Sequence, residues 1–296
     1  MNRNIKTKLA FTLIELLVVI AIIGILSALI IIGMSSTTQK ANIAKSQIFA
    51  NSLRNSLMGD MVSEWKLDEG AGDTISDTWG SNNGTKAGAT WEAITTNCVY
   101  GKCLSFDGDA DNINFGNKTD FNLASTSHTI SVWFKTSTTT TDHIISRFNG
   151  GSPGAGYVIF VSSGKVCFSE RADGGDFLAR DSALTYNDNS WHFVTYTVDI
   201  SLKTGRFCID GTFLPLDTYT GNLINYNNNL YIGGPQVGYY FTGLIDDIRI
   251  YDAAMPAFQI NEQYYTGLNK LLANRGVETS EYEQRIVELN YNYAEN

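Results

Sequence analysis

The chain has 296 residues, of which 43% are hydrophobic and 12% are aromatic, and its formal net charge is -9. This composition supports a substantial hydrophobic core and excludes a disordered chain, and the length allows one large domain with appendages. An acidic body repels phosphate groups, so the composition argues against nucleic-acid binding by that body.

The N-terminal segment has the pattern of a membrane anchor. Arg3, Lys6 and Lys8 stand in the first ten residues without any acid, and residues 16–34 are almost entirely apolar. As a helix this run reaches roughly 28 Å, close to the thickness of a bilayer core. The basic flank stays in the cytoplasm, which places the remainder outside a membrane crossed once. An ordinary secretory signal is disfavoured because the run is too long and no A-x-A site follows it.

Glu15 lies at the edge of this apolar run, where a carboxylate is costly unless it finds a partner. The motif A-F-T-L-I-E, residues 10–15, resembles the prepilin signature of type IV pilins and pseudopilins. The resemblance implies that a prepilin peptidase cuts between Ala10 and Phe11 and that the new amine is methylated. It also implies that Glu15 aids assembly, because it can neutralise the protonated N-terminus of a neighbouring subunit. The family usually has Gly before the cut, where this chain has Ala10.

The helix is expected to continue beyond the membrane. Residues 35–58 contain no Pro or Gly, and Ile48 or Phe49, Leu53 and Leu57 recur at helical spacing before Gly59. The prediction is a leader over residues 1–10 and a transmembrane and stalk helix over residues 11–60.

The body of the chain changes to a β pattern. From residue 61 to residue 251, short β-rich runs alternate with Gly, Asn and Asp clusters. In HTISVWFKT, Ile130, Val132 and Phe134 alternate with Ser131 and Trp133, which predicts a half-buried strand. The runs are not separated by crossover helices, so the pattern predicts an antiparallel two-sheet sandwich and excludes a parallel α/β fold.

Several landmarks follow one another in a fixed order: WKLDEGAGDTISDTWGSNNGT, CLSFDGDADNINFG, ISVWFKT, WHFVTYTVD, FCIDG and FTGLIDDIRIYDAAMPAFQI. This order resembles the laminin G-like, concanavalin A-like jelly roll of the bacterial type, which is distantly similar to pentraxins. The expected fold is therefore mainly β. An antiparallel jelly-roll β-sandwich over residues 61–255 follows the long N-terminal transmembrane α-helix and precedes a short C-terminal helical segment.

The C-terminal residues 256–296 are predicted to form a helical hairpin. One helix is expected over residues 259–274 and ends before Gly276. Ser280 followed by Glu283 has the pattern of a capping box that starts a second helix, which extends to about Leu289. The hairpin is expected to pack against the sandwich or the stalk.

The four cysteines predict two disulfides outside the cytoplasm. Cys98 and Cys103 close a very short loop, and Cys167 and Cys208 stand in two β-like runs that could lie side by side. The connectivity is left open, and four buried free thiols are the alternative. Cys and His do not occur at the spacing of a zinc site.

Neither spacing nor motif indicates catalysis. Asp246 and Asp247 are adjacent, and adjacent strand residues point to opposite faces, so they do not have the arrangement of a glycosidase pair. The acidic run DGDADN, residues 107–112, lacks the Gly and Glu of a calcium loop and is better explained as a hairpin tip. The laminin G-like resemblance instead implies one structural calcium, with Asp77 and either Asp246 or Asp247 as carboxylate ligands.

The stretch YIGGPQVGYYFTG matches the place where pentraxins hold an acidic, calcium-bound ligand site, but it contains no acid. Tyr239 and Tyr240 in this stretch are candidates for stacking on a sugar or packing on a partner protein. The alternative is that at least half of the aromatic residues in this stretch belong to the core.

The expected function is that of a minor pilin or pseudopilin in a bacterial cell membrane, non-catalytic, with the sandwich displayed for adhesion to a glycan or an extracellular protein. Its expected partners are the inner membrane, the prepilin peptidase and other pilin-like subunits. Two alternatives remain: a ligand-free pseudopilin of a type II secretion or DNA-uptake machine, and a membrane-tethered glycoside hydrolase.

Overall fold

The computed structural model describes residues 17, 18, 20, 59–148, 156–175, 177–234 and 238–295. The predicted leader and nearly all of the predicted stalk helix lie outside these residues. Within the described part of the chain, no helix has the length and apolar character needed to cross a membrane.

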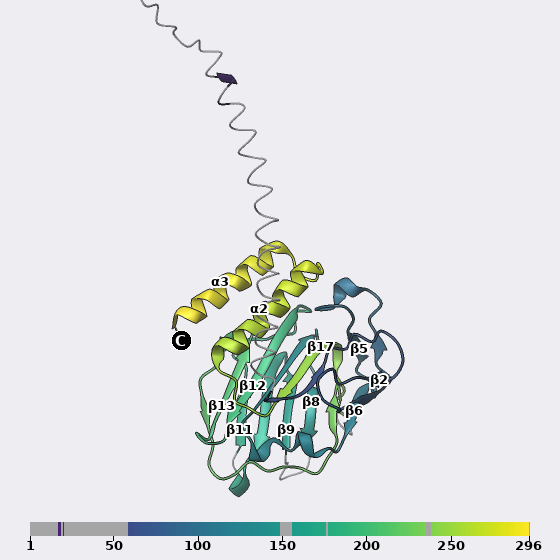
Figure 1. Ribbon diagram of the computed structural model, residues 1–296, viewed down its shortest axis with the longest axis vertical. Coiled ribbons are helices and arrows are strands. Elements are labelled where there is room, and N and C mark those ends of the chain that lie inside the picture. The colour runs from purple at the N-terminus through teal and green to yellow at the C-terminus, as the bar shows by residue number, and fades with distance from the viewer. Residues whose placement is uncertain are drawn as a thin grey trace, which may run out of the picture.

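The described body is a sandwich of two β-sheets with two helices packed on it (Figure 1). Sheet A contains β1 (Met61–Trp65), β4 (Thr90–Trp91), β5 (Leu104–Asp107), β7 (His128–Lys135), β12 (Trp191–Asp199), β13 (Thr204–Ile209), β14 (Thr212–Phe213), β15 (Asp217–Thr218) and β17 (Thr242–Tyr251). Its order is β14-β13-β12-β7-β17-β5-β4, with β1 also paired to β17 and β15 to β13.

The second sheet, sheet B, contains β2 (Thr74–Ile75), β3 (Gly84–Ala87), β6 (Asn112–Gly116), β8 (Asp142–Phe148), β9 (Gly156–Ser162), β10 (Lys165–Arg171), β11 (Phe177–Asp181) and β16 (Leu230–Ile232). Its order is β11-β10-β9-β8-β16-β6-β3-β2. Strands that are neighbours in sequence and strands that are distant in sequence both pair antiparallel, for example β8 with β9 in sheet B and β17 with β7 in sheet A. The predicted antiparallel sandwich is confirmed.

The main core lies between the two sheets. Ile130, Val132 and Phe134 on one face of β7 pack in the same buried cluster as Ile159 on β9 and Phe168 on β10. Every second residue of a strand points to the same face, so the alternation seen in the sequence delivers these side chains to one layer. Each fully buried side chain of this size stabilises the fold by about 1.5–3 kcal/mol.

Two helices cover the outer face of sheet A. They are α2 (Ala257–Ala273) and α3 (Thr279–Glu295), drawn side by side in yellow at the upper left of Figure 1. The ring of Trp133 on β7 lies 5.7 Å from that of Tyr264 on α2 and 5.2 Å from that of Phe193 on β12. Gly267 allows this approach, because a Cβ there would lie 2.3 Å from the Trp133 ring. Sheet A is therefore the middle of three layers.

The third layer explains one wrong prediction. The strand β7 is buried on both faces, not half-buried, because Ser131 and Trp133 lie under α2 while Ile130 and Val132 face sheet B. The predicted C-terminal helices are present, and the hairpin packs on the sandwich. The second helix begins at Thr279, so Ser280 stands in its first turn and does not precede it.

One of the two candidate cysteine pairs forms a disulfide. Cys98 and Cys103 are joined, as predicted, whereas Cys167 and Cys208 are buried free thiols. The expectation of a second disulfide is therefore wrong. Cys167 alternates with core residues of sheet B and Cys208 with core residues of sheet A, so both thiols point away from the space between the sheets.

Candidate functional site

A small pocket opens where β17 is interrupted. The pairing of β17 with β7 shifts register between Asp246 and Arg249, and Asp247 has a φ of 48°. This bulge breaks the alternation of side chains, so Asp246 and Asp247 line the same pocket. The prediction that they point to opposite faces is therefore wrong. The complete lining is Lys66, Asp68, Tyr100, Asp246, Asp247 and Lys270.

The pKa values of the two adjacent carboxyl groups shift in opposite directions. Burial and the nearby Asp247 charge raise the pKa of Asp246 well above its usual value, although its Oδ2 accepts hydrogen bonds from the Val99 and Tyr100 amides at 3.0 and 3.3 Å. Burial would also raise the pKa of Asp247, but the nearby Arg249 and Lys270 charges and the hydrogen bond from Arg249 together outweigh burial and lower that pKa to about 2. The site therefore favours the protonated form of Asp246 and the ionised form of Asp247.

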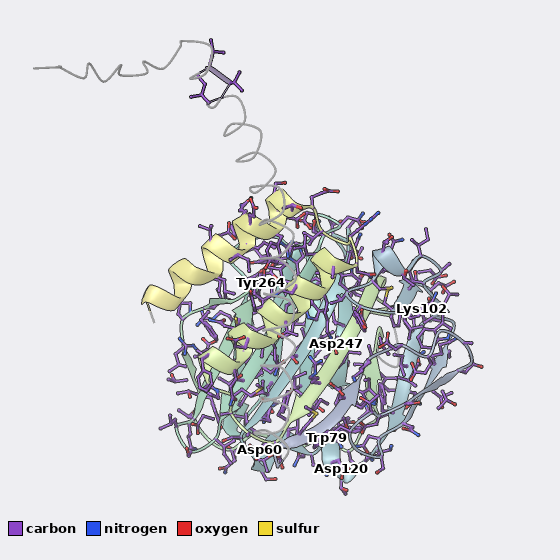
Figure 2. All side chains as sticks on the ribbon, turned by 45° about the horizontal axis from the view of Figure 1, so that its top comes forward. Asp60, Trp79, Lys102, Asp120, Asp247 and Tyr264 are labelled. Carbon is purple, nitrogen blue, oxygen red and sulfur yellow. A yellow bond between two sulfur atoms is a disulfide. The ribbon has the colours of Figure 1, made fainter. Side chains whose placement is uncertain are left out.

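Arg249 connects the pocket to the first strand. Its Nε donates to Oε1 of Glu64 at 3.1 Å, and its Nη2 donates to Oδ1 of Asp247 at 2.6 Å. Lys270 of α2 approaches the other oxygen of Asp247 at 3.6 Å. Figure 2 shows Asp247 on β17 beside the helix that carries Tyr264. The buried charges thus tie β1, β17 and α2 together.

The Asp77 carboxylate accepts hydrogen bonds from backbone amides. Its Oδ1 accepts the backbone amides of Glu64, Trp79 and Gly80 at 2.9–3.0 Å, and its Oδ2 accepts the amide of Asn82 at 3.0 Å. Burial would raise the pKa of Asp77, but these four hydrogen bonds lower it. Asp77 does not line the pocket that contains Asp246 and Asp247. Among the described residues, His, Cys, Asp and Glu side chains do not form a group of three that would hold a metal ion.

The aromatic stretch before β17 divides between surface and core. Phe241 is fully buried and contacts Phe106, with ring centroids 6.1 Å apart. Tyr240 is half-buried, whereas Tyr239 is 44% exposed. The Tyr239 ring stacks on His143 of β8 at 4.9 Å with only 7° between the planes. Tyr239 therefore presents an aromatic ring at the surface, with the His143 ring stacked against it.

Comparison with known proteins agrees with this architecture. Residues 107–261 match the family model of the concanavalin A-like lectin/glucanases superfamily. The chain belongs to that superfamily. Residues 5–31 match the prokaryotic N-terminal methylation motif, so the fusion of the two features predicted from the sequence is confirmed.

Individual relatives of this superfamily member are distant. Over 143 residues the chain is 27% identical to adhesion G-protein coupled receptor V1 of Danio rerio, a match over 45% of this chain and 2% of that protein. The binding domain of Paraclostridial Mosquitocidal Protein 1 has a TM-score of 0.60 at 17% identity, over 72% of this chain and 53% of the other. The botulinum neurotoxin serotype D binding domain has a TM-score of 0.54 at 16% identity, over 72% of this chain and 53% of the other. The chain spans about half of these solved chains, and at such identity the likeness shows the fold alone.

The processing residues Ala10, Phe11 and Glu15 lie outside the described residues. The methylation motif that contains them implies a protein anchored in the membrane or assembled in a surface filament. Sequence reasoning missed Asp68, Tyr100 and Lys270 of the pocket, because chain folding brings them to Asp246 from distant positions. For Tyr100 the sequence offered one signal, the short CVYGKC loop that its two terminal cysteines could close.

A second charge cluster surrounds the buried His192 at the start of β12. His192 is 5% exposed, with Nδ1 2.7 Å from Asp210 and Nε2 3.0 Å from Asp188. Burial alone would lower the pKa of His192, but the Asp210 and Asp188 carboxylates outweigh it and raise the pKa to about 9. The imidazole is therefore protonated at neutral pH, and the sequence did not indicate this.

This shift predicts a pH dependence of stability. Because the pKa of His192 is higher in the folded protein than in the unfolded chain, the protonated imidazole contributes its full stabilisation below about pH 6.5. That contribution is lost as the pH rises through about 9. Wild type should lose more unfolding free energy across this window than His192→Gln, by at most about 3 kcal/mol. Urea unfolding of both chains at several pH values measures the difference. A difference between the two chains that does not change with pH would contradict the assignment.

Proposed function

We propose that this chain is a minor pilin or pseudopilin whose sandwich is an extracytoplasmic, non-catalytic binding module. The observation that carries the proposal is the presence, in one chain, of a prokaryotic N-terminal methylation motif and a concanavalin A-like domain. The motif supplies an anchor that a prepilin peptidase processes and that packs with other pilin-like subunits in the inner membrane. The domain extends from that anchor into the extracytoplasmic space.

The surface of the domain suits recognition better than turnover. Tyr239 offers an exposed ring held flat by His143, which is the arrangement used to stack on a sugar or on an apolar side chain of a partner. The two paired carboxyl groups, Asp246 and Asp247, are committed to the Val99 and Tyr100 amides and to Arg249. We therefore assign the ligand to a glycan or extracellular protein that contacts Tyr239, with Tyr240 beside it.

The test uses the full chain in detergent on arrays of glycans and extracellular matrix proteins. Tyr239→Ala should weaken binding of any captured ligand by about three- to tenfold, because one stacking contact contributes about 0.5–1.5 kcal/mol. Phe258→Ala is the matched control, since Phe258 is an aromatic side chain that is 50% exposed on α2. Equal loss in the two variants would contradict the role of Tyr239, and release of sugar products would contradict a non-catalytic role.

The structural calcium stays a prediction. In the family resemblance Asp77 and either Asp246 or Asp247 would supply carboxylate oxygens, which Ca²⁺ prefers. Repeating the array measurements in calcium and in chelator, together with thermal unfolding in both, tests it. A Tm that does not change between the two conditions removes calcium from the proposal.

A ligand-free pseudopilin of a secretion or DNA-uptake machine is the second candidate. It is favoured if the full chain assembles with other pilin-like subunits and yet captures nothing on the arrays. The acidic character of the chain, with a net charge of -9, makes direct contact between the sandwich and nucleic acid unfavourable.

A further inference from the structure

The base of the loop closed by the Cys98–Cys103 disulfide is buried, although the loop is short and Tyr100 at its tip is 56% exposed. Cys98, Val99 and Cys103 are all 0% exposed. They belong to the same apolar cluster as Leu268 and Leu271 of α2. The disulfide therefore lies at the contact between the helical layer and sheet A.

The helical hairpin holds the carbonyl groups at the start of this loop. Asn274, at the C-terminal end of α2, donates from Nδ2 to the carbonyl oxygens of Thr95 and Cys98, the latter at 3.1 Å. Gly276, in the turn between α2 and α3, fits closely, because a Cβ there would lie 3.2 Å from the Thr96 carbonyl oxygen. From the other side, Trp191 of β12 donates from Nε1 to the Asn97 carbonyl at 2.8 Å.

The amide groups of the loop hold the closing strand. Val99 and Tyr100 donate to Oδ2 of Asp246, which is 1% exposed. The ammonium of Lys270 on α2 lies 5.2 Å from the centre of the Tyr100 ring. The loop thus contacts β12, β17 and α2 at once, and its buried amides and carbonyls find their hydrogen-bond partners on these elements.

We propose that the Cys98–Cys103 disulfide is a redox-controlled latch that docks the C-terminal helical hairpin on sheet A. In the oxidised chain the closed loop presents its carbonyls to Asn274 and its amides to Asp246. In the reduced chain the loop opens, these partners are lost together, and α2 and α3 separate from the sheet. The sandwich core between sheets A and B does not contain the disulfide, so it stays folded in both states.

The closing step needs an oxidant. Two thiols lose two electrons and two protons and form one S–S bond, and a disulfide donor of the extracytoplasmic space is reduced to two thiols in exchange. Oxidised glutathione supplies this exchange in vitro. The inference relies on the proposed function only for the place where the oxidant acts, so it is tested without any ligand of the sandwich.

Amide hydrogen exchange of the full chain in detergent tests the latch. In Cys98→Ser/Cys103→Ser, exchange within residues 257–289 should rise at least about tenfold, while β9 and β10 stay within about twofold of wild type. Asn274→Ala keeps the disulfide and should raise exchange in the helices by a smaller factor, about threefold. Cys167→Ser, which removes a buried thiol of sheet B, is the matched control and should leave the helices unchanged.

A refolding experiment adds the redox dependence. Wild type that is unfolded, reduced and refolded should regain protection of the helices only when oxidised glutathione is present, and protection of β9 and β10 with or without it. Helices protected equally in the reduced chain overturn the latch. Parallel loss of protection in the helices and in β9 and β10 also overturns it. If the double variant aggregates, unchanged exchange of the helices in Asn274→Ala is by itself enough to overturn the latch.

Discussion

Replacing Arg249 by leucine will destabilise the sandwich by about 3–5 kcal/mol, the usual cost of leaving buried carboxylates without their cation. Arg249 donates to Glu64 at 3.1 Å and to Asp247 at 2.6 Å. Burial raises the pKa of both acids, and the Arg249 charge is the largest of the effects that together bring both pKa values below their usual range. Without it, Glu64 and Asp247, 4% and 6% exposed, keep only the longer ion pairs with Lys66 and Lys270, at 3.7 and 3.6 Å.

The measurement is thermal unfolding followed by circular dichroism, and the expected fall in Tm is roughly 10 °C. Arg275→Leu is the matched control, since Arg275 is exposed in the turn between the two helices and should change Tm little. A double variant in which leucine replaces Arg249 and glutamine replaces Glu64 should recover part of the loss. A Tm equal to that of wild type in Arg249→Leu would contradict the role of the buried network.

Replacing Glu15 by alanine will leave the sandwich folded and will reduce assembly into filaments at least about tenfold. A carboxylate at the edge of an apolar segment is costly unless a cation neutralises it, and in the proposed filament the protonated N-terminus of a neighbouring processed subunit would be that cation. Losing one such pair costs more than about 1.4 kcal/mol per contact, which is a factor of ten in an association constant. The measurement is the amount of the chain in sheared surface filaments relative to the amount in the membrane.

Ser27→Ala provides the control for this variant, because it changes a polar residue of the same apolar segment without removing a charge. Its assembly should match that of the parent. Filaments formed by Glu15→Ala in the parental amount would remove the proposed pairing, although a tethered binding module would survive.

The sheet architecture was readable in the sequence because period-two patterns are local. Ile130, Val132 and Phe134 alternate with their neighbours, and the structure delivers them to the core between the sheets. The second buried face of the same strand was not readable. Trp133 could have been taken for a surface residue, because the helix that covers it starts more than a hundred positions later in the chain.

The site was readable only in part, for the same reason. The stretch GLIDDIRIY identified Asp246 and Asp247, but alternation placed them on opposite faces, and a non-glycine residue with φ of 48° cannot be recognised from one sequence. Lys270 and Tyr100 reach the pocket through tertiary packing alone. The pairing of Cys98 with Cys103 was predictable because the closed loop is short. Whether Cys167 could pair with Cys208 depended on which sheet each strand joins, and the local pattern does not show this.

Intact-mass and N-terminal sequence analysis of the chain from its native membrane shows whether the first ten residues are removed before assembly. We expect a mature chain that begins at Phe11, with its terminal amine methylated, so that residues 1–10 are absent. A native chain that still carries these ten residues would contradict assembly through Glu15, and only a membrane-tethered jelly roll would remain.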